Sequence, residues 1–306
     1  MHLERLLVII DPTEMQQPSL ERAVWMARHT GAALELLVCE YHSLIGLEAL
    51  FSTAHAQIAK NHCLEQRQQW LENLAEPLRL QGLRVQCSVT WGKPLHDIVN
   101  AHLNATQPDL VFKTARPHNV VHNLLLNNES WQLIRHCAAP LWLVRTHHEW
   151  RGKRLAVALD PVHQEDPNAT QDRQLIRSAR VLEQQVGFHV DYIHSHTPLP
   201  PSLVFDAGLI ADYGYYVERS GERQRAALKH LLDDCAIAAQ SRHFLHGFAE
   251  ETLAHFVENH AIDLLIMGAV ARGHWDELLI GHTAERVLES APCDLLVIKS
   301  VTGHSA

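Results

Sequence analysis

The residues with the clearest chemical potential lie in the stretch 263–299. It opens with a short apolar run, Asp263–Met267, which predicts a buried parallel strand. A loop that contains Gly268, Gly273 and Gly281 follows, and an amphipathic helix pattern begins at His282. Glycines let backbone N–H groups approach an anion, and the start of a helix attracts negative charge. The pattern therefore predicts a site for a phosphate-bearing ligand, although glycines that serve only tight turns would give the same spacing.

Composition and charge exclude several classes of partner. The chain has 306 residues and a formal net charge of -9, so it lacks the basic balance that nucleic acid or an anionic membrane selects. No apolar run reaches the length of a transmembrane helix. Residues 1–12 also lack the basic stretch, apolar core and cleavage site of a signal peptide. We predict a cytoplasmic protein without membrane insertion or a nucleic-acid partner.

The chain states almost the same pattern twice, at a spacing near 150 residues. Leu6–Pro12 reappears as Leu155–Pro161, and Trp91–Leu95 is matched by His246–Glu250. Such a period is too long for a solenoid and indicates a duplicated domain. We expect one domain at 1–147 and a second at 152–306, joined by a short polar stretch.

Within each half, strand and helix patterns alternate, which predicts an α/β fold with a five-stranded, doubly wound (Rossmann-like) parallel sheet. In the first half we expect strands near Arg5–Ile10, Ala33–Cys39, Arg84–Trp91, Asp109–Lys113 and Leu141–Arg145, with helices at Pro18–Thr30, Ala54–Leu80, Leu95–Asn104 and Ser130–Cys137. In the second half we expect strands near Arg154–Asp160, Phe188–His194, His243–His246, Leu264–Met267 and Leu295–Lys299. Right-handed crossovers then place a crevice at the carboxyl ends of the first and fourth strands of each half.

The loop after Met267 resembles the ATP-loop of the universal stress protein family, G-x2-G-x9-G-[S/T]. Gly268 and Gly281 stand where the first and third glycines belong, while Ala271 replaces the second glycine. His282 stands in the hydroxyl position, and Thr283 follows one residue late. The motifs VIIDP, GHTAERV and CDLLVIK extend the resemblance to the whole chain, which is similar to tandem universal stress proteins of the E subgroup of Gram-negative bacteria.

The resemblance implies a bacterial stress-response protein that is not an enzyme and binds ATP or another phosphate-bearing ligand. It implies that Asp160 contacts a nucleoside, that Ser195 beside His194 touches the base, and that the loop holds the phosphates. The full set that it assigns to the ligand is Asp160, Pro161, His194, Ser195, Met267, Gly268, Ala271, Arg272, Gly273, Gly281, His282 and Thr283. Ala271 and His282 alter the phosphate chemistry, and Asp160 before Pro161 is also a common turn former.

The first half has lost the loop. Its fourth strand is followed by Lys113–Asn123, which contains no glycine, and Pro117 removes a backbone donor. We therefore expect Asp11 to end a structural strand and the first half to serve as a scaffold. The final strands, Leu141–Arg145 and Leu295–Lys299, are apolar and would lie at sheet edges, so we predict that the halves pack as a pseudo-dimer. Further dimerisation and protein partners stay open.

Two other features carry alternatives. The stretch Pro198–Gly221 follows the second strand of its half and is either a lid for an amphiphilic ligand or a packing segment. The 24 histidines include His194 with His196, and His243 with His246, on neighbouring strands. Without a Cys/His cluster we expect no metal site, and a response to pH stays open. The six cysteines contain no C-x-x-C pair, and no nucleophile elbow or P-loop is present.

Overall fold

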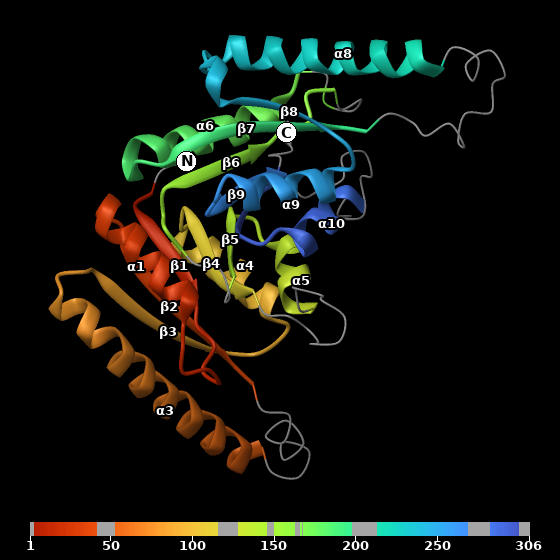
Figure 1. Cartoon of the computed structure of the whole chain (residues 1–306). Coiled ribbons are helices and arrows are strands. Elements are labelled where there is room, and N and C mark those ends of the chain that lie inside the picture. Colours follow the sequence, from red (N-terminus) through yellow and green to blue (C-terminus); the bar gives the residue numbers. More distant parts are fainter. Residues whose placement is uncertain are drawn as a thin grey trace. The chain divides into compact units, whose positions relative to one another are not determined.

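The computed structural model describes residues 3–41, 53–115, 128–145, 150–162, 166, 168–197, 213–268 and 282–299. It divides into two compact units, Met1–Thr146 and His147–Ala306. Each unit is considered by itself, because the positions of the two relative to one another are not determined (Figure 1). The expected pseudo-dimer therefore stays a prediction.

The first unit alternates strands and helices along the chain. Its elements are β1 (Arg5–Ile9), α1 (Pro18–Thr30), β2 (Ala33–Glu40), α3 (Thr53–Leu80), β3 (Val85–Trp91), α4 (Leu95–Thr106), β4 (Leu110–Ala115), α5 (Asn128–His136) and β5 (Leu141–Arg145). The strands are all parallel, in the order β3-β2-β1-β4-β5. The first strand thus lies between the second and the fourth, as the doubly wound prediction requires.

The second unit repeats this arrangement. Its elements are β6 (Arg154–Ala158), α6 (Thr170–Val186), β7 (His189–His196), α8 (Tyr213–Asp234), a short 3-10 helix (Ala239–Ser241), β8 (Arg242–His246), α9 (Ala249–Asn259), β9 (Leu264–Gly268), α10 (His282–Ser290) and β10 (Asp294–Ile298). Its parallel strands run in the order β8-β7-β6-β9-β10, so the fold class expected from the alternating pattern is confirmed in both halves.

The cores follow from the apolar runs. Strands β4 and β5 are buried along their whole length, because parallel strands between helices have no solvent-facing side. The apolar face expected for Ala284, Val287, Leu288 and Ala291 is largely confirmed: Val287 and Leu288 of α10 and Ala291 just after it are buried, and Ala284 is half-buried. In α3, Ala56, Leu71 and Ala75 are buried, and the leucines at positions 64, 74 and 78 are half-buried.

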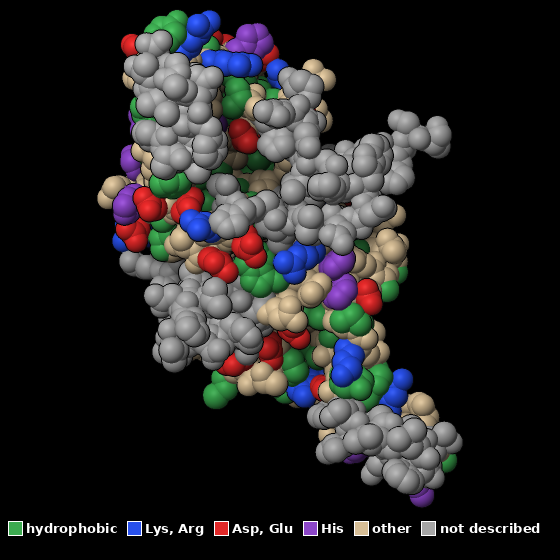
Figure 2. All heavy atoms as spheres, turned by 90° about the vertical axis from the view of Figure 1, so that its right-hand side faces the viewer, with side chains coloured by type: hydrophobic (Ala, Val, Ile, Leu, Met, Phe, Trp, Pro, Cys, Tyr) green, Lys and Arg blue, Asp and Glu red, His purple; other side chains and the backbone are tan. Residues whose placement is uncertain are grey.

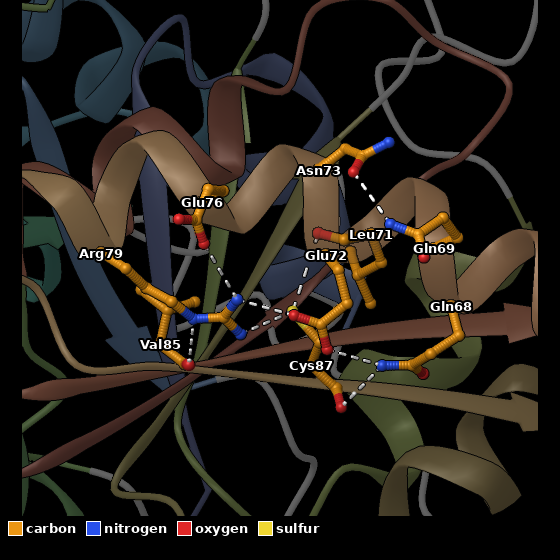
Figure 3. A network of polar contacts seen from close by, with 9 residues as sticks. All are labelled: Gln68, Gln69, Leu71, Glu72, Asn73, Glu76, Arg79, Val85 and Cys87. Atoms are coloured by element: carbon orange, nitrogen blue, oxygen red, sulfur yellow. Dashed lines mark hydrogen bonds and ion pairs between the residues drawn. The ribbon is translucent and has the colours of Figure 1, made fainter.

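Strand β3 is an edge of its unit, and side chains of α3 cover it. Arg79 donates from Nε to the carbonyl of Val85 (3.0 Å) and pairs with Glu72 (2.6 Å), while Gln68 donates to the carbonyl of Cys87 (3.5 Å) (Figure 3). Unpaired carbonyls at a sheet edge otherwise invite another strand. The polar face of this long helix therefore protects the edge.

Two differences from the sequence expectation concern the second unit. Strand β7 continues to His196, so His194 and Ser195 lie inside the strand rather than at its end. The stretch expected as a non-repeated lid or packing segment was misjudged in part, because Tyr213–Gly221 forms the first turns of α8. This helix takes the same place in the element order as α3, and a run of tyrosines with Gly214 disguised its periodicity. Residues 198–212 lie outside the described part.

Candidate functional site

The carboxyl ends of β6 and β9 form the frame of the candidate site. The two strands are parallel neighbours, with Val157 opposite Ile266. Asp160 and Pro161 follow β6, and Met267 and Gly268 end β9, so these four predicted residues come to one edge of the sheet. Strand order reverses here, because β7 lies on the other side of β6, and such a switch point is where open α/β sheets bind ligands.

Asp160 is exposed at this edge. Its backbone N–H donates to Oδ1 of Asp172 in α6 (3.2 Å), and its carboxylate has no hydrogen-bond partner among the residues that the structure describes. Asp11, at the same place in the first unit, accepts hydrogen bonds from both the N–H (2.9 Å) and the hydroxyl (2.6 Å) of Thr13. Asp11 therefore holds a local turn, as expected of a structural residue, whereas Asp160 presents a free acceptor.

Gly268 does not serve a left-handed turn, because its φ lies outside that region. The carboxamide of Gln171 in α6 occupies the space instead: a Cβ at position 268 would lie 1.9 Å from its Nε2. Gln171 is only 4% exposed, and Nε2 also donates to the carbonyl of Ile298 at the end of β10 (3.3 Å). A side chain at position 268 would therefore have to displace the buried carboxamide of Gln171 from between α6 and the sheet.

His194 and Ser195 are engaged inside the protein. His194 is buried, with Nδ1 2.8 Å from the carbonyl of Leu159 and Nε2 2.7 Å from Oε1 of Gln224 in α8. The hydroxyl of Ser195 donates to the carbonyl of Gly247 (2.9 Å) and lies 2.8 Å from that of Thr252. These hydrogen bonds join the end of β7 to the neighbouring strand end, turn and helix, and they occupy polar atoms of both side chains.

The remaining predicted residues belong to the loop and the start of α10. Ala271, Arg272, Gly273 and Gly281 lie outside the described residues. His282 and Thr283 are the first residues of α10, and their side chains are likewise outside the described part. The helix start thus follows β9 as the motif required, and the contacts of the loop stay a prediction.

The structure adds residues at the start of α6 that the sequence reasoning missed. Asp166 caps this helix by accepting the N–H groups of Thr170 (2.9 Å) and Gln171 (3.0 Å). Gln171 and Asp172 are both buried and face the carboxyl ends of the strands. The sequence could have indicated them, because they lie one turn before Leu175 and Ile176 and so put polar side chains on the buried face of α6.

The space-filling view shows the side toward which β7 runs in Figure 1. In its upper part an acidic side chain lies beside hydrophobic ones (Figure 2). Within the described part of the chain, no group of three or more His, Cys, Asp or Glu residues could hold a metal ion.

A sequence profile described as the universal stress protein family matches residues 2–145 and 153–299, which is nearly the whole chain. The chain belongs to the universal stress protein family. It carries two tandem copies of the family's domain, and the resemblance found in its motifs is confirmed. The family is one of the stress response.

Curated relatives extend the match over nearly their full lengths. Universal stress protein E of Escherichia coli (strain K12) is 25% identical over 297 residues, which cover 97% of this chain and 94% of the relative. The protein of the same name from Salmonella typhi is 24% identical over 296 residues, covering 97% and 94%. The Universal stress protein E homolog of Haemophilus influenzae is 24% identical and covers 98% of both chains.

Solved structures share the fold of this universal stress protein. A protein of unknown function from Pseudomonas aeruginosa PAO1 has a TM-score of 0.73 at 23% identity, with 97% of this chain and 92% of that chain covered. A universal stress protein from Archaeoglobus fulgidus DSM 4304 has a TM-score of 0.66 at 15% identity, with 97% of each covered. Among the described residues, no helix combines the length and apolarity needed to cross a membrane.

Proposed function

We propose that this universal stress protein binds a phosphate-bearing ligand of the nucleotide type in its second unit and acts through ligand occupancy rather than by catalysis. The ligand would lie at the carboxyl ends of β6 and β9. Its role in stress resistance would follow from contacts that the loaded unit makes with other proteins, while the first unit serves as a scaffold.

The free carboxylate of Asp160 is the observation that carries this proposal. An exposed acceptor beside a switch point is suited to the hydroxyl groups of a sugar, because a carboxylate accepts hydrogen bonds from both. The first unit supports the contrast, since Thr13 occupies the carboxylate of Asp11. The frame is common to the two units, and the available acceptor differs between them.

The phosphate end of the ligand would lie on the loop from Gly268 to Thr283. The start of α10 would contribute unpaired N–H groups, which attract an anion. Arg272 adds a positive charge to this loop, and His282 adds a donor. Ala271 places a methyl group where the family motif has glycine, so the loop favours a ligand whose phosphates make fewer backbone contacts than those of ATP.

Calorimetry of the whole chain with ATP, paired with mass spectrometry of whatever copurifies, tests the proposal. We expect Asp160→Ala to weaken binding about tenfold, because one hydrogen bond to a charged group is lost. Gly281→Arg should abolish binding by filling the loop. Asp11→Ala is the matched control, since it removes the equivalent carboxylate from the unit without the loop, and it should leave the affinity unchanged.

Three outcomes would contradict or redirect the proposal. If Asp11→Ala loses binding and Asp160→Ala keeps it, the ligand binds in the first unit and the proposal is contradicted. An amphiphile that copurifies without phosphate would favour a lipid-like ligand beneath the segment after β7. If calorimetry detects no heat of binding for ATP at millimolar concentration and mass spectrometry detects no copurifying small molecule, a scaffold without a small ligand is favoured.

A further inference from the structure

His196, the last residue of β7, is a buried imidazole without a partner. Its side chain is 2% exposed, and neither ring nitrogen makes a hydrogen bond of normal geometry within the described ranges; the nearby Gln224 side chain acts on the ring but bonds His194 instead. Buried polar atoms are nearly always paired, so an orphaned ring calls for a physical reason. The ligand site proposed above does not use it.

The ring is packed between a strand and a helix. On β8 it faces Phe244 and His246, with ring centroids 6.0 Å and 6.3 Å away. On α8 it faces Gly221, where an added Cβ would lie 3.6 Å from Cδ2 and 3.8 Å from Nε2 of the imidazole. The ring therefore lies against the backbone of α8, and a larger residue than alanine at 221 would push the helix away.

The described groups that face His196 carry no negative charge. His194 is on its own strand, His246 is on β8, and Gln224 is on α8. Arg225, also on α8, has its guanidinium 4.5 Å from the ring centroid of Phe244 and 3.4 Å from Nε2 of His246. No carboxylate of the described residues pairs with His196 or Arg225, so among these residues a proton added here meets only neutral or positive neighbours.

Burial is the main reason why the pKa of His196 is lowered from its ordinary value of 6.5. The Gln224 side chain opposes this in part, and the neighbouring His194 and His246 lower the pKa further. A histidine that stays neutral when folded contributes its full stability above pH 6.5. As the pH falls below that value, protonation favours any state in which the ring reaches water.

Helix α8 is anchored unequally along its length. Its second half buries Leu228, Leu231 and Leu232, and Asp233 and Asp234 near its end form ion pairs with Arg242 and Arg173. Within residues 213–227 the only buried residue is Gly221. The contact with His196 and the bond from Gln224 to His194 join the first half to the sheet, and because this half buries less apolar surface than the second, we expect it to open more easily.

The first unit has a different pair at the same positions. Glu40 ends β2 as His196 ends β7, and their carbonyls accept the N–H groups of Gly92 and Gly247, each at 3.0 Å. Glu40 is paired with Arg67 of α3 at 2.7 Å.

Arg67 and Gly221 are equivalent along their helices. Each lies the same number of residues before a leucine whose carbonyl accepts the N–H that follows the helix, Leu78 in α3 and Leu232 in α8. An ion pair in one unit thus corresponds to an uncharged imidazole against a glycine in the other.

We propose that His196 is an acid-sensitive latch: while neutral it holds the first half of α8, Tyr213–Gln224, on β7 and β8, and on protonation it releases that half. The same event reaches the ligand crevice, because Gln224 bonds His194, which bonds the carbonyl of Leu159 next to Asp160. Opening of α8 removes one of the two hydrogen bonds of the His194 ring.

Hydrogen exchange of the whole chain at pH 7.5 and 5.5, corrected for intrinsic rates, tests the latch. One pH unit below the unfolded pKa, a lowered folded pKa can change the opening equilibrium by at most about tenfold. We expect exchange of peptides within 213–224 to rise at pH 5.5, with about tenfold as the upper bound, while 225–234 and α3 change little. Helix α3 is the internal reference, because the ion pair Glu40–Arg67 takes the place of the latch there.

Substitutions separate the latch from other histidines. His196→Leu removes the titration and should abolish the rise, and so should the pair His196→Glu with Gly221→Arg, which transplants the partners of the first unit. His230→Gln is the matched control on the same helix, since its side chain is 79% exposed, and it should keep the rise.

Several results would overturn the proposal. Equal corrected rates at both pH values in the unchanged chain would do so, whatever the variants show. If the rise persists in His196→Leu but disappears in His194→Gln, His194 and not His196 is the group that responds to pH. A rise of equal size in α3 would indicate general acid destabilisation.

Discussion

The two units of this universal stress protein share a strand order but differ in the interactions of equivalent polar side chains. In the first unit these side chains are paired: Asp11 accepts hydrogen bonds from Thr13, and Glu40 forms an ion pair with Arg67. The second leaves them open, with a free carboxylate at Asp160 and an unpartnered ring at His196 among the described residues. Duplication therefore preserved the frame, while one copy kept groups that can respond to a ligand or a proton.

A third pair of positions shows the same divergence at the contact between the first helix and the fourth strand. In the first unit the second residue of α1, Ser19, bonds the hydroxyl of Thr114 in β4 (3.1 Å). In the second unit the second residue of α6, Gln171, covers Gly268 in β9. A small hydroxyl pair in one copy corresponds to a large amide and a glycine in the other, so the volumes balance.

The largest effect should come from breaking the closed pair of the first unit. Arg67→Met keeps the apolar stem but removes the guanidinium that pairs with the buried carboxylate of Glu40, so we expect a loss of about 3 kcal/mol in unfolding free energy. Urea unfolding of the whole chain measures this. Gln69→Met on the exposed face of α3 is the control and should cost about 0.5 kcal/mol or less. A loss near zero for Arg67→Met would mean that Glu40 is solvated.

The turn after the third strand of each unit should respond next. Gly92 and Gly247 both have φ in the left-handed region, at 147° and 133°, so alanine is strained at either position by about 1–3 kcal/mol. At 247 the new Cβ would also lie 2.9 Å from Cγ2 of Thr252, against 3.4 Å from Ile98 at position 92. We expect Gly247→Ala to cost about 1 kcal/mol more than Gly92→Ala. Equal losses in thermal unfolding would contradict the difference between the units.

Gly268→Ala should destabilise the second unit by about 2 kcal/mol, because the methyl group displaces the buried amide of Gln171 and breaks its bond to the sheet. A double-mutant cycle sharpens the comparison. Gln171→Ser with Gly268→Thr installs the pair of the first unit, and it should recover most of the stability that Gly268→Thr alone removes. If the double variant is as unstable as the sum of its two single changes, the positions are not equivalent.

The smallest effect concerns acid stability of the first unit. Burial raises the pKa of Glu35, but His102, 2.8 Å away, together with Thr106 and Arg5, outweighs burial and leaves that pKa below 4.5. A carboxyl whose pKa is depressed on folding contributes stability above pH 4.5 that disappears as the pH falls through the folded pKa.

Glu35→Gln should therefore remove about 1 kcal/mol at pH 6 and flatten the decline below pH 4.5. Urea unfolding at a series of pH values measures both. Glu65→Gln, an exposed position on α3, removes the same charge and should preserve the slope. An unchanged slope in Glu35→Gln would assign the acid dependence to other carboxyls.

The alternation of buried runs and helix patterns was enough to predict the fold, because a parallel strand between helices has to be apolar along its length. The β1, α1 and β5 segments were predicted to within a residue of their bounds. Helix α8 was not, because its first turns carry tyrosines and glycines that local propensity disfavours. Packing of its leucines on the sheet decides that segment.

The candidate site was likewise predictable only in part. The positions of Asp160 and Gly268 could be predicted, since they lie at or just after the ends of strands that the repeat identifies. What covers Gly268 was not, because Gln171 is almost a hundred positions away in the chain and meets it only across the layers of the fold.

By itself the sequence determined that two copies of one α/β domain follow each other and that only the second keeps a glycine loop. Tertiary structure decided which polar side chains have a partner and which have none among the described residues, Asp160 and His196 above all. The reason is physical: periodicity records whether a side chain faces the core, whereas its partner comes from another element brought near by folding.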